Sequence, residues 1–167
     1  MRTSPVRILL WILLVISFAV LTKYILFKKS TGFYRNYFAH EFHFRKTARE
    51  GFKNANFRLL HSINLIANAN RLSPEYKMDN LGGNIFGFAP LGILLPLLFF
   101  RLRNFFRLSA MIFFISLCFE TAQLLTGLGV FDVDDLLLNT IGGMLGYLAV
   151  IFFTKKNSIR GDRARLA

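Results

Sequence analysis

The stretch FETAQLLTGLGVFDVDDLLLNTIGGMLGY, residues 119–147, decides the fold. Two polar residues, Glu120 and Gln123, lie inside an apolar run, which a short Gly-rich turn separates from a second apolar run. The turn and the start of the second run hold four more polar side chains: Asp132, Asp134, Asp135 and Asn139. A carboxylate buried in a membrane costs about 3 kcal/mol or more, so such residues usually face a bundle interior or a hydrated cavity. This cluster is therefore the first candidate for a functional site.

Composition indicates an integral membrane protein. The chain has 167 residues, 54% of them hydrophobic and 20 of them Phe, and the apolar residues are concentrated in long runs. The net charge is +12, but the basic residues flank the apolar runs or lie in one loop, as expected beside anionic lipid. No groove-reading or base-stacking module is visible, which argues against a nucleic-acid partner. A single cysteine, Cys118, excludes an intramolecular disulfide and a Cys-rich metal site.

Four apolar runs are long enough to cross a bilayer: residues 8–27, 81–100, 108–126 and 136–153. We therefore expect an all-α membrane protein with four transmembrane helices. Residues 1–29 are expected to form a signal-anchor helix, because no small-residue cleavage site follows the first run. Lys23, near the end of that run, can reach the interface with its ammonium group. Residues 80–153 would form a core of three helices, and residues 154–167 a basic tail.

Residues 30–79 form the longest segment outside these runs. It is basic and aromatic, with Phe33, Tyr34, Tyr37 and Phe38 at helical spacing and Phe42 and Phe44 at strand-like spacing. We interpret it as an amphipathic element that lies on the bilayer between the first two helices. The alternative is a solvated, irregular loop.

The distribution of basic residues predicts the orientation. The N-terminus, the 101–107 loop and the tail are basic, whereas the 127–135 loop carries only acidic charges. The positive-inside rule therefore places both termini in the cytoplasm and the acidic loop outside. The basic 30–79 segment would also lie outside, but it approaches the length at which loop charges stop steering topology.

Two pairs of glycines are spaced for close helix packing: Gly83 with Gly87, and Gly142 with Gly146. Small residues four apart let two helix backbones approach each other. Either pair could therefore serve as the face through which a homo-oligomer forms.

In this topology the polar side chains of three elements meet at the outer leaflet. We predict a ligand-binding site made of Asn80, Asn84, Glu120, Gln123, Asp132, Asp134, Asp135 and Asn139. Asp134 or Asp135 could instead cap a helix, and Asn84 and Gln123 could simply join helices by hydrogen bonds. Capping does not explain Glu120, which lies about two turns inside a helix and must be protonated, paired or hydrated there. Glu120 is the strongest candidate for a functional group.

Three blocks of the sequence resemble the VanZ-like family of bacterial membrane proteins. They are NLGGNIFGFAPLGILLP at 80–96, SLCFETAQ at 116–123 and FDVDDLLLNTIGGMLGY at 131–147. A weaker match, INLIANA at 63–69, has Ala67 where family members usually have proline. Together the blocks cover roughly the last hundred residues. The resemblance implies a bacterial cytoplasmic membrane protein, in a family named for a determinant associated with teicoplanin resistance.

The favoured function is binding of an amphiphile at the outer leaflet, without a cofactor or a resident metal. The ligand would be a lipid, a lipid-linked wall precursor or a lipoglycopeptide. The alternative is a membrane enzyme that acts on a lipid-linked substrate, with Glu120 as acid or base and the aspartates holding a divalent cation. No Ser-His or Cys-His pairing, HExxH motif or phosphate-cradling loop supports an enzyme. A carrier is disfavoured because four helices show no inverted repeat.

Overall fold

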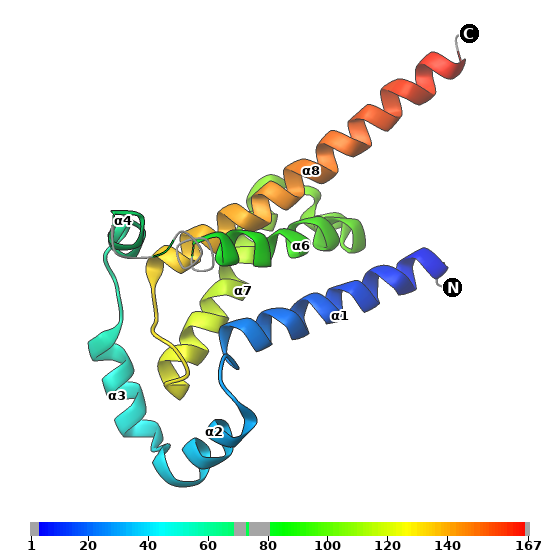
Figure 1. Cartoon of the computed structure of the whole chain (residues 1–167). Helices are drawn as coiled ribbons and strands as arrows, with labels where there is room; N and C mark the ends of the chain where they lie inside the picture. Colours follow the sequence, from blue (N-terminus) through cyan, green and yellow to red (C-terminus); the bar gives the residue numbers. More distant parts are fainter. Residues whose placement is uncertain (1–3, 69–72, 74–80, 166–167) are drawn as a thin grey trace.

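A computed structural model of the chain describes residues 4–68, 73 and 81–165, and the side chains of 154–165 are not described. The described residues form helices and no strand. The four long or apolar helices are α1 (Pro5–Ile25), α6 (Gly83–Leu98), α7 (Phe105–Thr126) and α8 (Val133–Arg165), shown in Figure 1. Shorter elements connect them: α2 (Thr31–Asn36), the π-helical turn η1 (Tyr37–Glu41), α3 (Phe44–Asn54), α4 (His61–Asn68) and the 3₁₀ turn η3 (Phe100–Arg103).

Three helices of the described chain are long and apolar enough to cross a membrane: α1, α7 and the first part of α8, Val133–Phe153. The fourth expected span, α6, is apolar but has only 16 residues. Sixteen residues rise about 24 Å, which is less than the ~30 Å thickness of a bilayer's hydrocarbon core. Of the four expected transmembrane helices, three are therefore candidate membrane spans by length and composition, and α6 is a shorter apolar helix. Figure 1 shows the N-terminal end of α1 and the C-terminal end of α8 projecting in the same general direction.

Glycines bring α6 and α8 into backbone contact. A Cβ at Gly92 of α6 would lie 1.7 Å from the carbonyl oxygen of Gly143, and one at Gly142 would lie 2.0 Å from that of Ile85. Gly146 is equally close to α6, with 2.1 Å to the carbonyl oxygen of Ala89. The predicted close-packing face of Gly142 and Gly146 is therefore covered by α6 of the same chain and is not free for a second copy.

The other predicted pair, Gly83 and Gly87, has different neighbours. A Cβ at Gly87 would lie 3.2 Å from Leu21 of α1, so this part of α6 faces the N-terminal helix. A Cβ at Gly83 would have no described atom within 4 Å. Along the rest of α1, Trp11 packs edge-on against Phe99, with ring centroids 5.5 Å apart. Most of the large apolar side chains of α1 point outward, as expected for a helix in contact with lipid.

The hydrophobic core lies between α1, α6, α7 and α8. Its buried side chains include Phe88 and Leu91 of α6, Leu108 and Ile112 of α7, and Met144 of α8. The core thus occupies the middle of the helix bundle and leaves the polar residues of the 119–147 stretch at one end of it.

Residues 31–68 form short helices rather than an irregular loop. The helix α3 packs on α7 so closely that a Cβ at Gly51 would lie 2.4 Å from the carbonyl oxygen of Leu124. Beyond α3, Asn56 pairs with the turn before α8, donating its backbone N–H to Phe131 and accepting from that of Val133, at 2.8 and 3.1 Å. The strand-like spacing of Phe42 and Phe44 was misleading, because Phe44 begins α3. The segment therefore folds against the end of the bundle that carries the acidic turn.

Candidate functional site

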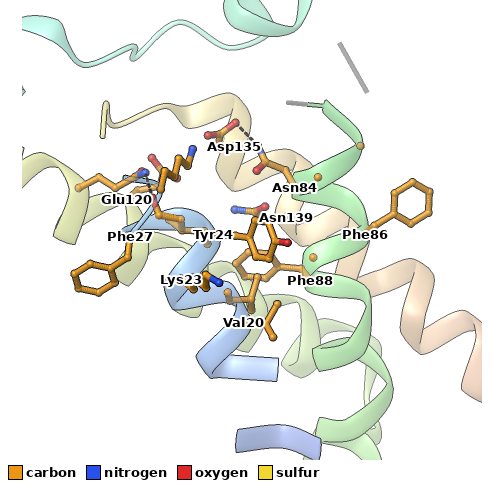
Figure 2. Close-up of a pocket in the computed structure, with 17 residues that line it drawn as sticks. Val20, Lys23, Tyr24, Phe27, Asn84, Phe86, Phe88, Glu120, Asp135 and Asn139 are labelled. Carbon is orange, nitrogen blue, oxygen red and sulfur yellow. Dashed lines mark hydrogen bonds between the residues drawn. The ribbon is translucent and has the colours of Figure 1, made fainter. Parts of the chain in front are cut away.

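A cavity of about 850 Å³ lies between α1, α6, α7 and α8. Five of the predicted site residues line it: Asn84, Glu120, Gln123, Asp135 and Asn139. Figure 2 shows Asp135 and Asn84 together at the top of this space, Glu120 to their left, and Tyr24 and Lys23 of α1 below them. The convergence of α6, α7 and α8 that the sequence predicted is therefore present, and α1 completes the site. Asn80 lies outside the described residues.

Two carboxyl groups from different helices belong to the cavity wall. Glu120 of α7 is only 2% exposed, and its Oε2 accepts a hydrogen bond of 2.9 Å from the backbone N–H of Asp132. Asp135 of α8 accepts a hydrogen bond of 2.5 Å from the side-chain amide of Asn84 on α6. Each carboxyl group is thus held in place by a donor from a neighbouring segment.

Two buried amide oxygens in the wall have no hydrogen-bond partner among the described residues. Gln123 donates its amide N–H to the carbonyl oxygen of Ile25 at 3.1 Å, which ties α7 to the end of α1. Asn139 donates to the hydroxyl oxygen of Ser116 at 2.8 Å. The oxygens of both amides, Gln123 Oε1 and Asn139 Oδ1, are buried and unpaired, although these side chains are only 5% and 1% exposed. Buried polar atoms nearly always have partners, so a donor from outside the chain would complete the site.

The contribution of α1 was not predicted from the sequence. Lys23, Tyr24 and Lys28 line the cavity from the end of this helix and the residues just after it. The only signal was Lys23, which interrupts an apolar run and which we interpreted as an interfacial anchor. An ammonium group at that position has the same sequence signature whether it faces phosphate groups of the bilayer or a cavity.

Asp134 has a structural task outside the cavity. Its side chain is 0% exposed, and its two oxygens accept backbone N–H groups of Leu60, Ser62 and Ile63 at 2.5, 2.8 and 3.2 Å. These N–H groups belong to the first turn of α4 and the residue before it, so Asp134 caps a helix that is distant in sequence. Capping was one of the two interpretations of this residue, but the capped helix is α4 rather than its own.

Asp132 caps α8 and also holds the segment before α4. Its Oδ1 accepts from the backbone N–H of Asp134 at 2.8 Å, which is the bond expected of a residue just before a helix. The same oxygen accepts from the side-chain amide of Asn56 at 2.9 Å, and Oδ2 accepts from the hydroxyl of Ser62. Asp135, the other proposed cap, instead pairs with Asn84.

These bonds bear on the proposed cation site. All four carboxylate oxygens of Asp132 and Asp134 already accept N–H or O–H groups. A divalent cation would have to displace those donors and release the segment around residues 56–63. Within the described ranges there is also no group of three or more His, Cys, Asp or Glu side chains placed to hold a metal ion. The aspartates of the turn are therefore better explained as structural groups.

The hydrogen bond between Ser116 and Asn139 supports a direct test of polar pairing in the core. We expect Ser116→Ala to lower the free energy of unfolding by about 1 kcal/mol, because the buried amide of Asn139 loses the hydroxyl to which it donates. The double variant Ser116→Ala with Asn139→Leu should recover most of that loss, since both polar groups are then gone. Thermal unfolding in detergent measures both values. Equal stability of Ser116→Ala and the wild type would show that the bond contributes nothing.

A family model described as VanZ/LLP1 matches residues 9–154. The match includes most of α1 and the helices of residues 31–68, which the sequence blocks recognised above leave out or cover only in part. No curated protein and no solved structure matches the chain.

Proposed function

Since the chain belongs to the VanZ/LLP1 family, we propose that it binds an amphiphilic ligand in the cavity between α1, α6, α7 and α8. The observation that carries this proposal is the pair of buried, unpaired oxygens of Gln123 and Asn139 beside the carboxyl groups of Glu120 and Asp135. Such a site binds a molecule with hydrogen-bond donors, namely hydroxyl, amide or ammonium groups.

The apolar part of the wall supports an amphiphile rather than a purely polar solute. Val20 and Leu21 of α1 and Phe86 and Phe88 of α6 line the same cavity as the carboxyl groups. The volume of about 850 Å³ falls within the range of sites for small molecules and headgroups. A ligand with a polar headgroup and an apolar tail satisfies both kinds of lining.

The location follows from the expected topology. With both termini in the bacterial cytoplasm, the cavity and the acidic turn lie toward the outer leaflet of the cytoplasmic membrane. The helices of residues 31–68 then belong to the outer surface, where exposed aromatic side chains such as Phe38, Phe44 and Phe52 can enter the bilayer and neighbouring cations can meet phosphate groups. A lipoglycopeptide such as teicoplanin, a lipid-linked wall precursor and a membrane lipid all reach a site there.

We expect Glu120→Gln to weaken binding of the ligand about tenfold or more, because a charged hydrogen bond contributes about 1.5–3 kcal/mol. Glutamine keeps an oxygen for the N–H of Asp132, so the fold should be retained. The measurement is the thermal shift of purified protein with a bacterial lipid extract, lipid-linked wall precursors or teicoplanin. A ligand at one hundred times its Kd stabilises the folded state by about 2.7 kcal/mol.

The matched control is Glu50→Gln, which removes the same charge from an exposed residue of α3 that does not line this cavity. It should retain the full thermal shift. Equal shifts for the wild type and Glu120→Gln with every ligand would contradict the proposed site. Conversion of a lipid-linked substrate by the wild type but not by Glu120→Gln would instead support the alternative in which Glu120 is an acid or base.

A further inference from the structure

The cavity has cationic and anionic walls. Lys23 and Lys28 come from α1 and the residues after it, whereas Glu120 and Asp135 come from α7 and α8. Within the part of the chain that the structure describes, no ion pair joins either lysine to either carboxyl group. The opposite charges therefore face the same space without neutralising each other by direct contact.

The acceptors on the anionic side specify the chemistry of the group that binds there. Gln123 Oε1 and Asn139 Oδ1 are buried and lack donors, and they lie in the wall that also contains Glu120 and Asp135. A primary ammonium carries three N–H donors and a positive charge, so it satisfies the amide oxygens and the carboxylates together. A quaternary ammonium has the same charge but no donor, and it would leave the two amide oxygens unpaired.

The cationic side suits a phosphate. Lys23 and Lys28 both line the cavity, and a lysine ammonium binds an anionic oxygen cluster as a point charge. The apolar residues Val20, Leu21, Phe86 and Phe88 also line the cavity, and Phe86 is 71% exposed. Acyl chains attached to the phosphate would contact apolar side chains of α1 and α6.

We propose that the ligand is an amphiphile whose headgroup joins a phosphate diester to a primary ammonium, as in an aminophospholipid with a phosphoethanolamine headgroup. This inference depends on the proposed function, because it names the ligand class of the same cavity. The phosphate lies against Lys23 and Lys28. The ammonium donates to Glu120, Gln123 and Asn139, with Asp135 as the second negative charge.

The test is a competition among phospholipids that share their acyl chains. Phosphatidylethanolamine, phosphatidylcholine and phosphatidylglycerol are mixed in equal amounts with the detergent-purified protein, and the retained lipid is quantified by native mass spectrometry. We expect retention of phosphatidylethanolamine to exceed that of phosphatidylcholine by about tenfold, as when buried acceptors lose their donors. Free phosphoethanolamine at the same concentration should not displace the lipid, because it lacks acyl chains to bury.

Two variants test separately where the ammonium and the phosphate of the headgroup bind. The double variant Ser116→Ala with Asn139→Leu removes the unpaired oxygen of Asn139 and also the Ser116 hydroxyl to which the Asn139 amide donates. The preference for phosphatidylethanolamine over phosphatidylcholine should therefore shrink severalfold. Lys28→Gln should weaken both of these lipids alike, because both carry the phosphate. Lys53→Gln removes the same charge from an exposed residue of α3 outside the cavity, and it should change neither value.

Equal retention of phosphatidylcholine and phosphatidylethanolamine would overturn the inference, since the N–H donors would then not matter. Preferential retention of phosphatidylglycerol would overturn it as well, because that lipid has no ammonium. If another amphiphile binds in a manner that requires Glu120 while the aminophospholipid does not, the proposed function stands and this inference falls. If nothing binds in a manner that requires Glu120, both fall.

Discussion

Replacing Gly92 by alanine should lower the free energy of unfolding by about 3 kcal/mol and the melting temperature by roughly 10 °C. The new methyl group would lie 1.7 Å from the carbonyl oxygen of Gly143, so the backbones of α6 and α8 have to separate. Alanine is the better helix former by about 1 kcal/mol, so a loss of stability would show that the helix contact outweighs local propensity. Thermal unfolding in detergent measures the effect.

Gly83→Ala is the matched control, because it makes the same change in the same helix where a Cβ meets no described atom within 4 Å. It should leave the melting temperature unchanged or raise it slightly. Gly142→Ala should resemble Gly92→Ala, since its Cβ would lie 2.0 Å from the carbonyl oxygen of Ile85. If Gly92→Ala is as stable as Gly83→Ala, α6 and α8 do not pack through their backbones.

Replacing Asp134 by alanine should release the segment that leads into α4. The variant leaves the backbone N–H groups of Leu60, Ser62 and Ile63 without their acceptor, at a cost of about 2–4 kcal/mol. The backbone of Leu60 adds to the effect, because its φ of 62° is in the left-handed region, which costs a non-glycine residue about 1–2 kcal/mol. Hydrogen exchange of these three amides should accelerate about a hundredfold, as an opening that becomes about 3 kcal/mol easier predicts.

Asp134→Asn should give an intermediate result, because both carboxylate oxygens accept N–H groups and an asparagine provides only one oxygen. Glu50→Ala removes an exposed carboxylate from α3 and should leave the exchange of these amides unchanged. Unchanged protection in Asp134→Ala would mean that α4 is held by its other contacts and that the cap contributes little.

A chain of hydrogen bonds joins the wall of the cavity to the segment before α4. Glu120 accepts the N–H of Asp132, whose carboxylate in turn holds Asn56 and Ser62. The segment before α4 is therefore positioned by the same turn that places Glu120. This explains why carboxylates that look alike in the sequence divide into cavity groups and structural groups.

The sequence by itself determined the helical membrane class and most of the polar lining. Long apolar runs predicted α1, α7 and α8, because a helix is the way a single apolar segment satisfies its backbone in lipid. Helical spacing and alternating helix direction brought Asn84, Glu120, Gln123 and Asn139 to one end of the bundle, since side chains three or four apart share a face. The family resemblance of the last hundred residues was confirmed and extended to residues 9–154.

Only the tertiary structure decided which acidic residues face the cavity and which helices close it. Asp132, Asp134 and Asp135 are within four positions of one another, yet their partners lie in segments far away in the sequence: Asn56, Leu60, Ser62, Ile63 and Asn84. Local sequence also gave no sign that α6 is short or that it covers the glycine face of α8. Local patterns determine helices through backbone hydrogen bonds and periodic side chains, whereas the role of a carboxylate depends on the donors that distant segments bring to it.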